Sequence, residues 1–150
     1  MFKRILLPTD GSSHALAAAR IAADLAKATE GRITAITAVE YEVVAGGLPE
    51  EIVRTLRGQI KRHAEEVLGE TVAAVQERGA AAEARIVEGH PASAILAEAE
   101  RGGYDVIVMG SRGITEAAGY REYVGSVTLR VLARASIPVL VMPPPAQVVD

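Results

Sequence analysis

Two glycine-containing segments carry the residues best suited to chemistry in this chain. Gly-Ser-Arg-Gly at 110–113 follows an apolar run, and Gly-Ser-Val-Thr at 125–128 opens a segment with helical spacing. Glycines let a backbone approach an anion closely, and the unpaired N–H groups at a helix N-terminus bind phosphate. Ser126 and Thr128 add hydroxyl groups, and Arg112 adds a positive charge. The combination indicates a phosphate-binding loop; the alternative is that the glycines only form turns and Ser126 only caps a helix.

A further candidate, Asp10, comes shortly after the first apolar run of the chain, at 5–7. Its carboxylate is suited to accept a hydrogen bond from a ligand amine or a sugar hydroxyl. Taken alone, an aspartate at this position is better explained by an Asx turn or a helix cap. The functional interpretation gains weight only if the fold places Asp10 beside the loop at 110–113.

Short strand-like runs alternate with helical spacings along the chain. Strands are predicted over 5–7, 32–40, 82–88, 104–109 and 138–142, and helices over 14–29, 49–78, 91–103 and 125–135. Ser12 or Ser13 is placed to cap the first helix, and Gly31 to end it. Gly58 and Gly69 weaken the second helix and are candidate bends.

This alternation implies an α/β fold, an open five-stranded parallel sheet with helices on both faces. Such sheets commonly have the strand order 3-2-1-4-5 or 2-1-3-4-5, and they bind ligands outside the carboxyl ends of the strands. In the first order, strands one and four are neighbours, which would bring Asp10 beside 110–113. We see no repeat or linker, so 1–150 is expected to form one domain, with 143–150 as a loose tail.

Composition argues against several function classes. The 150 residues carry a net charge of −3, no cysteine, and only four Tyr and one Phe as aromatic residues. Nucleic-acid binding would need a basic face and stacking rings, and a thiol nucleophile or Cys-ligated metal would need cysteine. The three histidines show no metal-ligand spacing. No run reaches the roughly 18 apolar residues of a membrane span, and no signal peptide is evident, so we expect a cytoplasmic protein without a membrane partner.

Four segments, in order along almost the whole chain, resemble the universal stress protein family. They are Ile-Leu-Leu-Pro-Thr-Asp-Gly-Ser at 5–12, Tyr-Asp-Val-Ile-Val-Met-Gly-Ser-Arg-Gly at 104–113, Gly-Ser-Val at 125–127 and Ile-Pro-Val-Leu-Val at 137–141. The resemblance implies the strand order 3-2-1-4-5 of the adenine nucleotide alpha hydrolase-like fold. It also implies the branch of the family that binds ATP, with Mg²⁺, through a Gly-x2-Gly-x9-Gly-Ser/Thr pattern.

The resemblance further implies roles for individual residues around the nucleotide. From adenosine to phosphate, they are Asp10 at the adenosine; Pro8, Thr9 and Val39 at the adenine; Met109, Gly110, Arg112 and Gly113 along the ribose and phosphate path; and Gly125, Ser126, Val127 and Thr128 at the phosphates. The family also implies a homodimer in which the last strand, Val139 to Met142, pairs across a two-fold axis.

One spacing departs from the family pattern. Eleven residues, 114–124, separate Gly113 from Gly125, where the family has nine. Loops absorb insertions at small cost, so both ends can stay in place; a longer loop can also bring Glu116 or Glu122 toward the phosphates and repel them. Three functions stay open: an ATP-binding regulatory homodimer of the stress response, a universal stress protein that acts through unknown protein partners without nucleotide, and a slow adenine nucleotide hydrolase. No general base is evident, so hydrolysis is expected to be slow at most.

Overall fold

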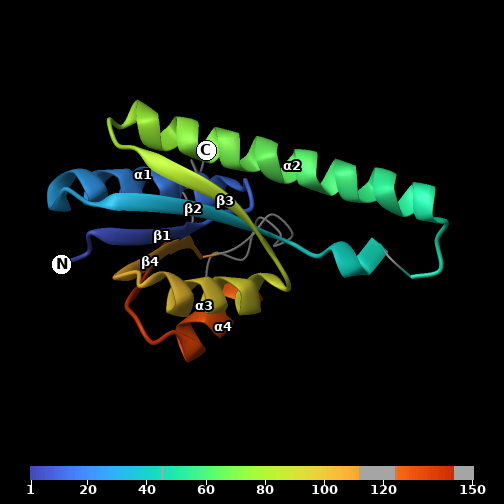
Figure 1. Ribbon diagram of the computed structural model, residues 1–150. Helices are drawn as coiled ribbons and strands as arrows, with labels where there is room; N and C mark the ends of the chain where they lie inside the picture. The colour runs from blue at the N-terminus through green and yellow to red at the C-terminus, as the bar shows by residue number, and fades with distance from the viewer. Residues whose placement is uncertain (45, 112–123, 144–150) are drawn as a thin grey trace, which may run out of the picture.

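The computed structural model describes residues 1–44, 46–111 and 124–143 (Figure 1). In chain order the elements are β1 (Arg4–Pro8), α1 (Ser13–Thr29), β2 (Arg32–Val39), the 3-10 helix η1 (Tyr41–Val44), α2 (Glu50–Glu77), β3 (Ala82–Glu88), α3 (Pro91–Gly102), β4 (Val106–Gly110), α4 (Ser126–Arg134) and β5 (Val139–Met142). The strands are parallel in the order β3-β2-β1-β4-β5, which confirms the predicted sheet. The predictions for Arg112, Gly113, most of the loop 114–124 and the tail from 144 onward lie outside the described residues.

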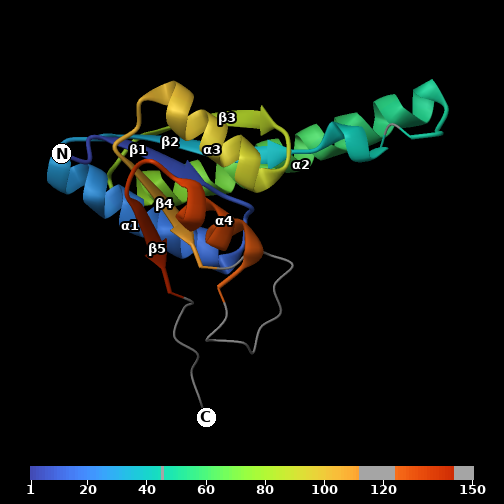
Figure 2. The same ribbon diagram turned by 90° about the horizontal axis from the view of Figure 1, so that it is seen from below.

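Helices cover both faces of the sheet, α1 and α2 on one face and α3 and α4 on the other (Figures 1 and 2). Side chains alternate between the faces along each strand. In β1, Ile5 and Leu7 pack toward α1 and α2, while Leu6 packs toward α3 and α4. The side of α1 that meets the sheet consists of buried alanines. Because alanine is small, α1 lies close to the strands at the point where the predicted site is formed.

Helix α1 begins as predicted, but a different residue ends it. The Ser12 hydroxyl accepts the N–H of Ala15 at 3.2 Å and caps the helix. The left-handed residue after the last turn is Glu30, at φ +57°, rather than Gly31. Gly31 serves a different purpose: a Cβ atom there would lie 2.7 Å from the carbonyl oxygen of Lys3, so glycine lets the start of β2 approach the chain before β1.

Helix α2 is longer than the sheet that supports it. Its first half, with η1, projects beyond the strands (Figure 1). No residue of 50–63 is buried, and the buried positions begin at Ala64. The helix runs unbroken through Gly58 and Gly69, the two glycines that the sequence offered as candidate bends. We call η1 and residues 50–63 the arm.

No helix in the described ranges combines the length and hydropathy needed to cross a membrane.

Candidate functional site

The loop after β1 is held in shape by its own polar groups. The Thr9 N–H donates to the Ile36 carbonyl at 2.8 Å, which continues the pairing of β1 with β2. The Gly11 N–H donates to the Thr9 hydroxyl at 3.2 Å, and the Ser12 N–H donates to Asp10 Oδ1 at 2.9 Å. Asp10 therefore forms the Asx turn that was the alternative to a ligand contact. One carboxylate oxygen of Asp10 thus has a structural role in the loop.

Helix α2 supports this loop through a buried chain of hydroxyl groups. The Thr9 and Thr71 Oγ1 atoms lie 3.1 Å apart, and the Thr71 hydroxyl donates to the Val67 carbonyl at 2.9 Å. Because Thr71 has one hydroxyl proton, which goes to Val67, Thr9 is the donor in the Thr9–Thr71 bond. The Thr9 hydroxyl proton is therefore engaged inside the protein rather than available to an adenine. The sequence does not point to Thr71, because a threonine within a helical segment does not indicate which distant residue it contacts.

A close packing contact joins the ends of β1 and β4. These two strands are neighbours in the sheet, so the loop containing Asp10 and the loop starting at Gly110 leave from the same edge. A Cβ atom on Gly110 would lie 2.9 Å from the backbone carbonyl carbon of His14, in the first turn of α1. Only glycine fits this position without moving backbone. The predicted juxtaposition of the two loops is therefore present.

The N-terminus of α4 is fixed against the end of β4 by two hydrogen bonds. The Gly125 N–H donates to the Ser111 carbonyl at 2.8 Å, and the Thr128 hydroxyl donates to the Gly110 carbonyl at 2.9 Å. Gly125 occupies the N-cap position, and no side chain caps this helix, while Ser126 is exposed. The first N–H groups of a helix lack partners within the helix, so this end provides donors for an anion.

One buried hydroxyl at this edge has no partner among the described residues. Ser111 is only 5 % exposed, and its Oγ has no hydrogen-bond partner within the described part of the chain. Leaving a buried hydroxyl unpaired costs about 1–3 kcal/mol. Such a group marks a position where a ligand atom would restore the missing hydrogen bond. Ser111 stands inside the motif that the sequence singled out, but its burial could not be deduced from spacing.

The remaining predicted residues are mostly buried. Val39 is buried at the end of β2, where its carbonyl accepts the Gly89 N–H at 2.9 Å. Met109 is buried, and Val127 packs against the same core cluster on the α3 and α4 face of the sheet. Pro8 is buried as the last residue of β1. These residues belong to the apolar packing beneath the carboxyl edge rather than to its polar groups.

Among the described carboxyl groups, the one with a resolved pKa shift lies away from this edge. Glu98 of α3 is buried and accepts hydrogen bonds from the Tyr104 hydroxyl at 3.1 Å and from the guanidinium groups of Arg85 and Arg101. Burial by itself raises the pKa of Glu98, but the hydrogen bonds from Arg101 and Tyr104 and the charge of Arg85 outweigh it. The pKa of Glu98 is therefore held below its ordinary value, and this cluster acts in stability rather than at the candidate site.

The model of the universal stress protein family matches residues 1–143. The chain belongs to this family. Among curated universal stress proteins, MJ0531 of Methanocaldococcus jannaschii is 34 % identical over 97 % of this chain and 84 % of its own. A Thermus aquaticus universal stress protein is 37 % identical over 95 % of this chain and 99 % of its own. The solved structure of the hypothetical protein MJ0577 has a TM-score of 0.80 and 28 % identity, covering 95 % of this chain and 96 % of that one.

More distant structures with the same fold hold nucleotides. A universal stress protein in complex with cAMP has a TM-score of 0.71 and 24 % identity, covering 93 % of this chain and 96 % of that one. A universal stress protein of Arabidopsis thaliana with AMP bound has a TM-score of 0.65 and 20 % identity, covering 92 % of this chain and 89 % of that one. At these identities the likeness shows that this chain shares the fold of those two proteins.

Proposed function

We propose that this universal stress protein binds ATP, with Mg²⁺, at the carboxyl edge of β1 and β4, and regulates a stress response according to nucleotide occupancy. The observation that carries the proposal is the buried Ser111 hydroxyl, which has no partner in the part of the chain that the structure describes. The carbonyl of the same residue accepts the N–H of Gly125, the N-cap of α4. A nucleotide phosphate satisfies both the hydroxyl and the helix N-terminus.

Each part of the edge supports one part of the nucleotide. The N-terminus of α4, with Gly125 and exposed Ser126, offers N–H and hydroxyl donors to phosphates. The Thr128 hydroxyl already donates to the Gly110 carbonyl, so its role is to position the loop. The adenosine half would contact Asp10 and the apolar walls near Val39. That the same fold holds cAMP or AMP in other universal stress proteins supports an adenine nucleotide here.

The same proposal includes a cytoplasmic homodimer formed through β5. This strand is the last in the sheet order and pairs with β4 along one side. Leu140 of β5 and Leu129 and Leu132 of the adjacent helix α4 are all more than two-fifths exposed. A second copy that extends the sheet would cover this edge strand and these leucines. The proposal predicts a dimer in sedimentation, and a monomer would contradict this part of it.

Nucleotide binding is tested by the melting temperature of nucleotide-free protein with and without Mg-ATP, compared with GTP and AMP. A ligand at 100 times its dissociation constant adds about 2.7 kcal/mol, or roughly 5–10 °C for a chain of this size. We expect Ser111→Ala to weaken ATP binding by about threefold to tenfold. The same change should leave the melting temperature without nucleotide unchanged or slightly higher, because it removes an unpaired buried hydroxyl.

Two results would count against this function. The first is a melting temperature of the unsubstituted protein that no nucleotide alters. The second is a Ser111→Ala variant that loses stability but keeps its affinity, because the hydroxyl would then belong to the fold. As a matched control, Ser136→Ala removes an exposed hydroxyl between α4 and β5 and should change neither quantity.

A further inference from the structure

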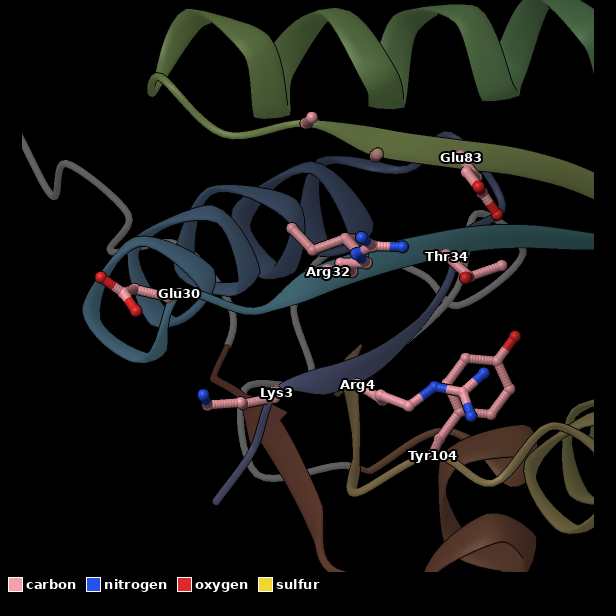
Figure 3. Close-up of a pocket in the computed structure, with 10 residues that line it drawn as sticks. Lys3, Arg4, Glu30, Arg32, Thr34, Glu83 and Tyr104 are labelled. Atoms are coloured by element: carbon pink, nitrogen blue, oxygen red, sulfur yellow. The ribbon is translucent and has the colours of Figure 1, made fainter.

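A cavity of about 650 Å³ lies at the opposite, amino edge of the sheet, beside the starts of β1, β2 and β3 (Figure 3). Its size is within the range of pockets that hold small molecules. In the close-up, the Arg4 side chain lies over the ring of Tyr104. Arg32 and Thr34 lie on the neighbouring strand, and Glu83 lies beyond Thr34. Nothing in the proposed nucleotide site involves these residues. Their chemistry therefore needs a separate explanation.

Two arginines at this edge occupy directly paired positions. Arg4 of β1 is the register partner of Arg32 of β2, so both side chains rise from the same face of adjacent strands. Like charges directly opposite each other on neighbouring strands are destabilising. Within the described residues, neither guanidinium has a carboxylate oxygen within 4.0 Å. Both side chains are exposed, so the repulsion between them is weak, and an anion placed between the two groups would relieve it.

The carboxylates around this edge leave the pair uncompensated. Asp105 Oδ2 accepts the backbone N–H groups of Lys3 and Arg4, each at 2.9 Å, and so is engaged with the main chain. Glu83 is the register partner of Thr34, which puts it diagonally across from Arg32. Glu30 and Lys3 lie at the other end of the cavity (Figure 3). The two arginines thus lie between Glu83 at one end of the cavity and Glu30, with Lys3 near it, at the other.

The guanidinium group of Arg4 lies over an aromatic ring before any ligand arrives. It lies over the ring of Tyr104, 5.5 Å from the centroid, and one of its nitrogens would be 3.2 Å from a Cβ atom on Gly103. Tyr104 is itself buried and donates its hydroxyl to Glu98. A cation fixed against a rigid ring loses little conformational freedom when it binds an anion.

We propose that this cavity binds a small phosphate monoester, with its phosphate between Arg4 and Arg32. A phosphate dianion matches the two positive charges, and guanidinium forks bind phosphate oxygens in pairs. The Thr34 hydroxyl adds a neutral donor. The cavity is much larger than a phosphate, so it also accommodates an organic body. Glu83 repels a second anionic group and favours a body with hydroxyl or amino groups. The site is independent of the nucleotide at the carboxyl edge.

The test is an NMR titration of ¹⁵N-labelled protein with inorganic phosphate and with glycerol 3-phosphate, at constant ionic strength set with chloride. We expect saturable shifts at the amides of Gly103 and Thr34, with tighter binding of the ester. Amides of Gly11 and Gly110 report on the carboxyl edge and separate binding at the nucleotide site from binding here. Shifts that fail to saturate at millimolar concentration, or that occur only at Gly11 and Gly110, would overturn the proposal. Tighter binding of inorganic phosphate would overturn the organic part of it.

Substitutions separate a ligand-binding role of the two arginines from a purely structural one. Arg32→Gln and Arg4→Gln should each weaken phosphate binding by about tenfold, whereas Arg54→Gln, an exposed control on the arm, should leave it unchanged. Glu83→Gln should strengthen binding because it removes a nearby negative charge. Without phosphate, Arg32→Gln should not lower the melting temperature, since it relieves like-charge repulsion. A lower melting temperature together with unchanged phosphate affinity would assign Arg32 to the fold and overturn the proposal.

Discussion

At the carboxyl edge of the sheet, the candidate site combines backbone N–H groups and hydroxyls with the carboxylate of Asp10. At the amino edge, the cavity is lined by the guanidinium groups of two arginines that share one register position. The carboxyl edge depends on the path of the main chain, as the contact between Gly110 and His14 illustrates. The amino edge depends on charge and on how Tyr104 and Glu98 fix the side chains around it. One sheet thus presents two edges that respond to different kinds of substitution.

The largest effect is expected where backbone meets backbone. Gly110→Val places a Cβ atom 2.9 Å from the backbone of His14, which cannot move aside as a flexible side chain would. We expect a loss of about 3 kcal/mol in the free energy of unfolding, measured with urea. In contrast, Gly58→Ala should raise stability by about 0.5–1 kcal/mol, because its Cβ meets nothing within 4 Å. A Gly110→Val variant as stable as the parent would mean that the two strand ends are not packed together.

An intermediate effect is expected from the charge cluster near the amino edge. Glu98→Gln leaves two arginines without their carboxylate and should cost about 2 kcal/mol near pH 7, a value reduced because both guanidinium groups are partly exposed. The pKa of Glu98 is lowered in the folded state. Its contribution is therefore fully present above the unfolded pKa of about 4.3 and is lost as the pH falls through the folded value.

Urea unfolding at several pH values checks the sign of this effect. The difference in stability between the parent protein and Glu98→Gln should shrink as the pH falls below about 4.3. A constant difference down to low pH would show that the cost comes from packing rather than from charge. The Gly110→Val cost should show no such dependence, which distinguishes the two edges.

The smallest effect concerns the support of the carboxyl edge by α2. Thr71→Val keeps the shape of the side chain but leaves the Thr9 hydroxyl without its acceptor, at a cost of about 1 kcal/mol in unfolding free energy. Thr71→Ser keeps the hydroxyl and should retain the bond to Thr9. If the two variants bind Mg-ATP equally well, the hydroxyl chain does not influence the loop. Weaker binding by Thr71→Val alone would establish that α2 positions it.

Periodicity predicted the fold because each strand and helix buries a regular set of side chains. The family motif at 110–113 also directed attention to Gly110 and Ser111. Periodicity and motifs could not predict contacts between segments that are distant in the sequence. The bond between Thr9 and Thr71, the burial of the Ser111 hydroxyl and the pairing of Arg4 with Arg32 all depend on register and helix placement. The local spacing of residues contains no information about strand register or about where a helix lies on the sheet.

The same limit explains the difference at the end of α1. A glycine near the last turn predicted a helix stop, yet Glu30 adopts the left-handed conformation and Gly31 makes room for the Lys3 carbonyl. The position of Gly31 could be explained from the sequence only as a helix end, whereas its cause is the close approach of the Lys3 carbonyl. For β4, the predicted start at Tyr104 was two residues early, since Tyr104 packs its ring into the core and Asp105 bonds the chain at the start of β1.

The arm turns α2 into a mechanical lever. From Glu50 to Thr71 the helix extends roughly 30 Å at about 1.5 Å per residue, and its free half carries no buried residue. A rotation of about 5° around Thr71 would therefore displace the outer end by roughly 3 Å while the Thr9 loop moves by a small fraction of that distance. A force applied at the outer end would therefore act about Thr71 with a lever arm of roughly 30 Å.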